Sequence, residues 1–290
     1  MAGEFKTVDE QISILEECGL KIPDKAAAAD FLLRNNYYRI SGYSLTLRDH
    51  AVFHKGACFQ DIVDIYECDH ELRHILLKYI EIIEVTTKSV FAYAFSELSG
   101  PLGYLQEELF SDSEKYRTIM ENAETLRKRR LKFEAYLKHY DNDLHQALPV
   151  WAFVDLLTMG DISKLYSCSP EQVKSTVACQ MGLRKKDGAL LGKFLYSMTI
   201  IRNLCAHDSR LYNRLFEQKP SLSRKEKELL IQDDQGIDNA HLYGFVIIMR
   251  RLLKPEDFHS LKDELLALSR RYPSVNMRHY GFRDDWEECL

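Results

Sequence analysis

The sequence has no apolar run approaching the roughly 20 residues that a membrane-spanning helix requires. Its start, Met1-Ala-Gly-Glu, also differs from the basic start of a secretory signal peptide. These two absences argue against an integral membrane protein and a secreted protein. We therefore expect a soluble, cytoplasmic protein without a membrane partner.

Paired cysteines and glycine-rich loops are missing as well. The seven cysteines lie scattered at positions 18, 58, 68, 168, 179, 205 and 289, and no two of them form a Cys-x2-Cys pair. Such a set is typical of reduced thiols and argues against a disulfide framework or a zinc finger. No glycine-rich phosphate-binding loop is evident, and we expect neither a cofactor nor a metal.

An overall basic charge is absent too, because 39 Lys and Arg stand against 44 Asp and Glu, for a net charge of −5. This balance argues against sequence-blind nucleic-acid binding over the whole surface. A local basic cluster can still contact RNA, and the candidates lie together at Arg127, Lys128, Arg129 and Arg130. The alternative for this cluster is a solvated helix end.

The sequence contains enough apolar residues for a large core, with 46% hydrophobic residues among 290. Apolar positions between Gln60 and about Leu98 repeat with helical period, which predicts a helix long enough to be kinked or broken. Glycines and an alternating run indicate short irregular or β structure near residues 35–59. We therefore expect an all-α protein with a helical domain at 1–216 and a C-terminal helical extension at 217–290.

Capping patterns mark further helices. Ser/Thr-x-x-Glu boxes occur at Thr7, Ser111 and Ser223, and each predicts a helix start. Further helices are expected at 111–140, 149–160, 161–166, 169–182, 237–253 and 255–272.

The stretch 188–216 is predicted to be one helix with two distinct faces. Its apolar face, which should pack on a core, consists of Phe194, Met198, Ile201 and Cys205. Its opposite face, with Arg202 on the flank, consists of Asn203, His207, Arg210 and Arg214. An imidazole that titrates near neutrality, set among permanent guanidinium charges, suits phosphodiester chemistry without a metal. A solvated polar face is the alternative.

The spacing of Arg202-Asn-x3-His207 resembles the Arg-x4-6-His signature of HEPN domains, which are helical bundles that include metal-independent endoribonucleases. Over roughly residues 5–216 the chain also resembles the abortive-infection Abi family (AbiD/AbiF type) of bacterial defence proteins. The segments that carry this second resemblance are Asn36–Tyr43, Ile65–Arg73, Ile83–Val85, Pro149–Trp151, Met159–Tyr166 and Arg202–Arg214.

The resemblance implies a HEPN-like bundle with toxin-like endoribonuclease activity in antiphage defence. In this interpretation His207 moves a proton and Arg202 holds the phosphate oxygens. Asn203 orients either His207 or the phosphate, and Arg210 and Arg214 hold flanking phosphates. HEPN nucleases commonly pair two such motifs, so a homodimer with opposed His207 faces is expected.

Other readings of the same residues remain open. The Arg/His face could grip RNA without cutting it, as a module held by a cognate noncoding RNA or an antitoxin partner. His70-Glu71-x-x-His74 matches the zinc-protease pattern His-Glu-x-x-His, although Leu77 and Ile80 occupy positions where the metzincin continuation needs Gly and His. A nucleophilic Cys205 is a further reading, weakened by its place on the apolar face.

Overall fold

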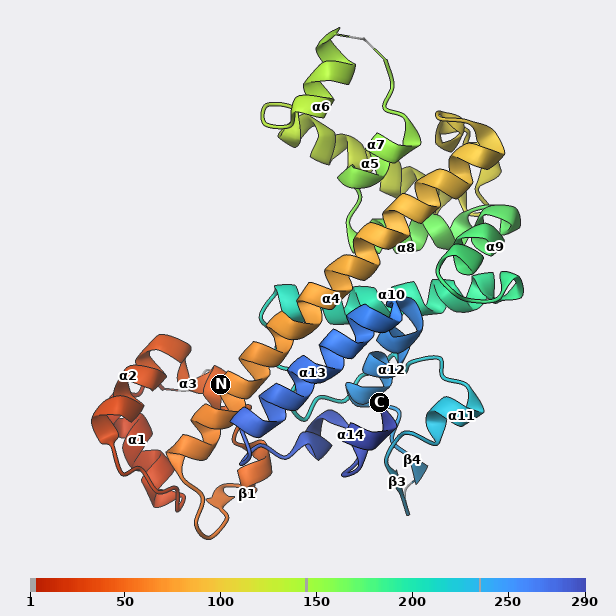
Figure 1. Ribbon diagram of the computed structural model, residues 1–290. Coiled ribbons are helices and arrows are strands. Elements are labelled where there is room, and N and C mark those ends of the chain that lie inside the picture. Colours follow the sequence, from red (N-terminus) through yellow and green to blue (C-terminus); the bar gives the residue numbers. More distant parts are fainter. Residues whose placement is uncertain (1–3, 144–145, 235) are drawn as a thin grey trace.

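The computed structural model of the protein describes residues 4–143, 146–234 and 236–290, and these are mostly helical (Figure 1). The α-helices are α1 (Val8–Glu17), α2 (Lys25–Asn35), α3 (Tyr37–Ser41), α4 (Phe59–Ser99), α5 (Ser113–Arg130), α6 (Ala135–Lys138), α7 (Val150–Phe153), α8 (Met159–Cys168), α9 (Glu171–Gln180), α10 (Gly188–Ala206), α11 (Arg224–Lys227), α12 (Tyr243–Leu252), α13 (Pro255–Arg271) and α14 (Trp286–Cys289).

Short elements fill several of the connections. Antiparallel pairs are formed by β1 (Arg48–Asp49) with β2 (Val52–Phe53), and by β3 (Gln232–Asp233) with β4 (Gly236–Ile237). Single helical turns of the 3-10 or π type span Leu45–Leu47, Gly103–Leu105, Glu107–Leu109, His139–Asp143, Val154–Leu156, Lys185–Asp187 and Met277–Tyr280. The all-α class with a small β insertion is therefore confirmed.

Helix α4 is the central element of the fold. Its 41 residues form one helix, so the break that its length suggested does not occur (Figure 1). Leu72, Leu76 and Ile80 on this helix are completely buried, as expected for a helix that has neighbours on several sides. Those neighbours include α7, α9, α10 and α13.

The C-terminal helices pack on the central helix. Helix α13 runs along α4 (Figure 1), and its Glu264 accepts hydrogen bonds from Lys78 Nζ at 2.6 Å and Tyr79 Oη at 2.7 Å. At the C-terminal end of α13, Arg271 Nη1 and the following Tyr272 Oη donate to Glu71 at 2.5 and 2.8 Å. Helix α12 contacts both α10 and α13.

Several predicted boundaries shift for local reasons. The helix expected at 111–140 begins after Asp112, whose carboxylate accepts from Lys115 N, and ends at Arg130. Gly160 does not end a helix, because a Thr158–Asp161 capping box starts α8 just before it. The helix expected from Ile237 begins at Tyr243, since Gly236–Ile237 pairs as a strand.

No helix in the part of the chain that the structure describes is both long and apolar enough to cross a membrane.

Truncating the centre of α4 should destabilise the protein strongly. We expect Leu76→Ala to lower the free energy of unfolding by about 2–5 kcal/mol, because it leaves a cavity in a core with close neighbours. Leu33→Ala, at an exposed position on α2, should change it by about 0.5 kcal/mol or less. Chemical denaturation checks both values, and equal effects would contradict the central position of α4.

Candidate functional site

The predicted helix 188–216 ends at Ala206, ten residues before its expected end. His207 caps this helix, because its main-chain N–H donates a hydrogen bond to Asn203 O at 3.0 Å. Asp208 then adopts a left-handed backbone with φ of 55°, which ends helical geometry. The polar stripe from Asn203 to Arg214 is therefore not a helix face. The apolar face of the same prediction is confirmed, because Phe194, Met198, Ile201 and Cys205 are buried.

A buried ion pair on α4 determines the path of the chain after α10. The Asp69 carboxylate, which is 0% exposed, accepts hydrogen bonds from the main-chain N–H of Leu211 at 3.2 Å and of Tyr212 at 2.8 Å. One turn later, Arg73 donates to Asp69 through Nη1 and to Asp208 Oδ1 through Nη2, the latter at 2.5 Å. The loop is thus held by main-chain and side-chain contacts to the same pair.

Two tyrosines complete the hydrogen bonding of Asp69. Tyr43 Oη donates to Oδ2 at 2.9 Å, and Tyr280 Oη donates to Oδ1 at 3.1 Å. Burial, followed by the neighbouring Asp69 charge, raises the pKa of both phenols well above the usual value. Both phenols therefore stay protonated and remain donors at physiological pH.

A cavity of about 540 Å³ opens where this loop meets the N-terminal segment. The basic residues that line it are Arg39, Arg48, His207, Arg210 and Arg214. Among the described lining residues the acid is Asp208, whose carboxylate and main-chain oxygen already accept from Arg39 Nη2 at 2.6 and 2.7 Å. The cavity therefore has an excess of positive charge and suits an anion.

Close packing brings these basic side chains together. A Cβ built on Gly42 would lie 3.3 Å from Arg210 Nε, so a side chain at this position would press on the guanidinium. Arg210 Nη1 donates to Tyr212 O at 2.6 Å. The Nε atoms of Arg39 and Arg48 are buried without a hydrogen-bond partner in the described part of the chain. Buried donors without a partner are uncommon in folded proteins.

The structure brings some of the sequence-predicted site residues together and not others. His207, Arg210 and Arg214 line the cavity. Arg202 and Asn203 do not line it; Arg202 Nε lies 3.8 Å from Glu84 Oε2 on α4, and Asn203 is exposed.

Sequence reasoning missed Arg39 and Arg48 as members of this site. The signal for Arg39 was its place in the Asn36–Tyr43 segment, and Arg48 lies in the strand β1 that follows. No periodicity could link them to His207, because the contact spans more than 150 residues of chain.

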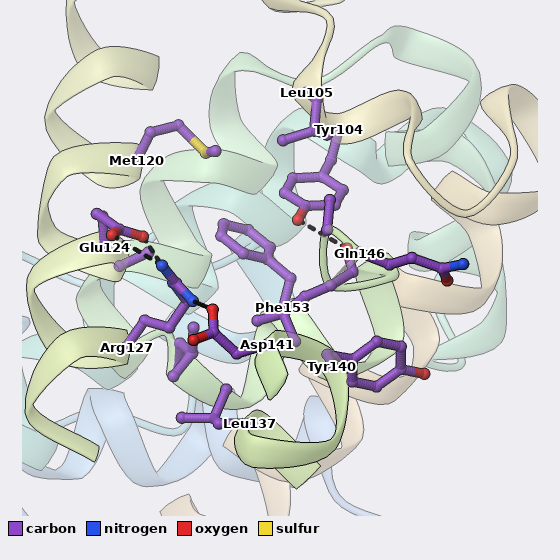
Figure 2. A pocket seen from close by; sticks show the side chains of 14 residues that line it. Tyr104, Leu105, Met120, Glu124, Arg127, Leu137, Tyr140, Asp141, Gln146 and Phe153 are labelled. Atoms are coloured by element: carbon purple, nitrogen blue, oxygen red, sulfur yellow. Dashed lines mark hydrogen bonds and ion pairs between the residues drawn. The ribbon is translucent and has the colours of Figure 1, made fainter. Parts of the chain in front are cut away.

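The basic cluster near residue 127 is partly neutralised. Figure 2 shows Arg127 inside a second cavity, of about 490 Å³, where Nη1 meets Asp141 Oδ1 at 2.5 Å and Nε meets Glu124 Oε2 at 2.8 Å. Lys128 Nζ lies 3.5 Å from Glu124 Oε1. Arg129 and Arg130 are exposed and are better placed than Arg127 to meet a ligand.

The zinc-protease reading loses support from the geometry. Glu71, its required base, is engaged by Arg271 and Tyr272. Among the described residues no cluster of three or more His, Cys, Asp or Glu side chains could hold a metal ion.

The nucleophilic reading of Cys205 is also weakened, because burial raises the pKa of its thiol to about 12. At neutral pH such a group is a thiol and not the reactive thiolate.

Comparison with known proteins identifies a family. A sequence model of Abi-like proteins matches residues 30–213, which is more than half of the chain. The matched region contains the Asn36–Tyr43 segment, the Asp69–Arg73 pair and the loop after α10. No curated protein and no solved structure matches the chain.

Removing the Asp69 charge should destabilise the fold. We expect Asp69→Asn to lower the free energy of unfolding by about 3–5 kcal/mol, because the buried Arg73 charge loses its buried carboxylate partner and keeps only the half-exposed Asp208. Asp30→Asn breaks the exposed pair with Arg34 on α2 and should cost about 0.5 kcal/mol or less. Denaturation of the two variants side by side tests this, and an effect of Asp69→Asn as small as the control would contradict it.

Proposed function

The chain belongs to the family of Abi-like proteins, and we propose that it is a metal-independent endoribonuclease of bacterial abortive-infection defence. The cavity beside His207 is the observation that carries this proposal. It combines one imidazole with four guanidinium groups, from Arg39, Arg48, Arg210 and Arg214. Guanidinium groups bind phosphate oxygens through paired hydrogen bonds and keep their charge at every physiological pH.

The reaction is attack of a ribose 2′-oxygen on the adjacent phosphorus. His207 accepts the 2′-hydroxyl proton, the new bond forms between the 2′-oxygen and phosphorus, and the bond from phosphorus to the 5′-oxygen breaks. The products are a 2′,3′-cyclic phosphate and a 5′-hydroxyl. The guanidinium groups of the cavity stabilise the negative charge that develops on the non-bridging oxygens.

The leaving 5′-oxygen needs a second proton carrier. We assign this role to His207 of a second copy of the chain, placed so that the two His207 faces are opposed. Arg202 and Asn203 are exposed or half-exposed beside this face, and we propose that they meet the same RNA in the dimer, Arg202 on the phosphate and Asn203 orienting the reacting groups.

Cleavage should depend on His207 and not on a metal. Purified protein should cut single-stranded RNA in excess EDTA and leave cyclic-phosphate ends. His207→Ala should lower the rate about 10²–10⁴-fold, because it removes the proton carrier. His259→Ala, at an exposed histidine of α13, should retain the rate of the unchanged protein. Mapping of product ends and initial rates measures both effects.

Two outcomes would contradict the nuclease proposal. Cutting that EDTA abolishes would indicate metal chemistry. RNA binding that depends on Arg210 and Arg214, without any cutting, would instead indicate a non-catalytic module held by a noncoding RNA or antitoxin; the position of Arg202 outside the cavity is the observation that favours this second candidate.

The nuclease proposal requires a dimer. Analytical ultracentrifugation should give a mass twice the 33.9 kDa of one chain, and cleavage rates should fall more steeply than the protein concentration on dilution below the dimer Kd. A protein that is monomeric at all concentrations yet fully active would contradict the assignment of the second proton carrier.

A further inference from the structure

A groove of about 520 Å³ lies between α4 and α7, away from the His207 cavity, and no role has been assigned to it. These two helices contact each other near the C-terminal half of α4 (Figure 1). The volume falls in the range of about 300–1,000 Å³ that is typical of small-ligand sites.

Exposed aromatic and aliphatic side chains line this groove. Trp151 is 54% exposed, Tyr93 is 66% exposed and Val85 is 60% exposed. Val85, Ala92 and Ser96 recur at helical spacing, so the floor is one face of α4 with small residues at its centre. Large apolar groups that stay open to solvent along one groove indicate a contact surface for a ligand.

The main chain that carries Trp151 is held in place by its neighbour Val150. It lies in the first turn of α7, where Val150 N donates to Pro101 O at 2.8 Å and Val150 is completely buried. This contact ties the start of α7 to the chain that follows α4. An exposed indole ring on an anchored main chain is suited to stacking against a flat partner.

Polar groups at the rim give the groove its ligand chemistry. Asp155 lines the groove, is exposed, and its carboxylate has no hydrogen-bond partner among the described residues. Its main-chain oxygen accepts from Arg130 Nη1 at 3.3 Å, so the exposed basic end of α5 borders the groove. At the opposite end of the groove, Lys88 Nζ donates to Glu84 Oε1 at 2.8 Å, and Glu84 Oε2 lies 3.8 Å from Arg202 Nε.

Aromatic faces next to basic side chains are the combination that binds unpaired nucleic-acid bases and their phosphates. A carboxylate accepts hydrogen bonds only, so it favours a base that presents adjacent N–H donors. Guanine presents two on its Watson–Crick edge, N1–H and the exocyclic amine. Adenine has one donor group there, next to an acceptor.

We propose that the groove between α4 and α7 binds an unpaired guanine of the RNA, stacked on Trp151 with its Watson–Crick edge toward Asp155. Arg129 and Arg130 would then hold the neighbouring phosphates. The choice of RNA as ligand rests on the proposed function, whereas the groove itself is independent of the His207 chemistry.

The test measures binding without cleavage. Fluorescence anisotropy gives the Kd of short single-stranded oligonucleotides with 2′-O-methyl riboses, which lack the attacking hydroxyl. Three oligonucleotides carry guanine, adenine or no base at one central position in a uridine run. The intact protein should bind the guanine form most tightly and the abasic form about tenfold or more weakly, since stacking of one base contributes an effect of that order.

Variants separate the contacts. Trp151→Ala should bind all three oligonucleotides as weakly as the intact protein binds the abasic form, and Trp151→Phe should restore part of the difference. Asp155→Asn should remove the preference for guanine over adenine. Arg129→Ala should weaken all three equally and reduce the salt dependence of Kd. Phe5→Ala, at an exposed aromatic outside the groove, is the matched control and should change nothing.

The outcomes distinguish this proposal from the nuclease proposal. Equal Kd values for the guanine and abasic forms, or for Trp151→Ala and the intact protein, would overturn the base site while leaving His207-dependent cleavage untouched. Absence of RNA binding altogether would overturn both. A groove that binds a protein partner through Trp151 and shows no base dependence would overturn the assignment to RNA.

Discussion

The buried pair of Asp69 and Arg73 is the interaction on which the rest of the site depends. Removing both charges from water has a large cost, which is offset only when every hydrogen-bonding position is filled. Here the donors come from the N-terminal segment through Tyr43, from the loop after α10 and from Tyr280 near the C-terminus. Segments distant in sequence must therefore converge on one turn of α4, and the His207 cavity forms where they meet.

This convergence concentrates like charges, and that has a consequence for binding. Arg39, Arg48, Arg210 and Arg214 share one cavity, so each guanidinium raises the free energy of the others. Asp208 compensates part of this repulsion from a left-handed backbone position that Asp tolerates better than most residues. A bound polyanion would compensate the repulsion that remains. Relief of this repulsion would therefore favour binding of an anion at the site.

Sequence periodicity predicted what depends on local pattern, and missed what depends on distant contacts. The apolar repeat of α4 and the buried face of α10 were predicted correctly because burial follows the helical period. The end of α10 was not, since residues 207–216 leave the helix where their main-chain N–H groups bond to Asp69, 142 positions away for Leu211. The helical stripe of Arg210 and Arg214 was consequently wrong, although both residues do reach the cavity with His207. Arg48 carried no signal in the sequence, and Arg39 was marked only by its place in the Asn36–Tyr43 segment, because no local rule encodes the contact between the two segments.

The central helix also sets the size of an RNA that could use the cavity and the groove together. On α4, Arg73 contacts Asp208, which lines the cavity, and Val85 lines the groove. These two positions are 12 residues apart, which at a rise of about 1.5 Å per residue is roughly 18 Å along the helix. Stacked nucleotides advance about 3.4 Å each along a strand. For a strand that stays stacked, this distance corresponds to about five nucleotides, and the two positions differ in direction around the helix, which lengthens the path further. Because α4 is a single rigid helix, this separation is fixed by the fold, so a base held on Trp151 would select phosphates at a set distance from it for the guanidinium cavity.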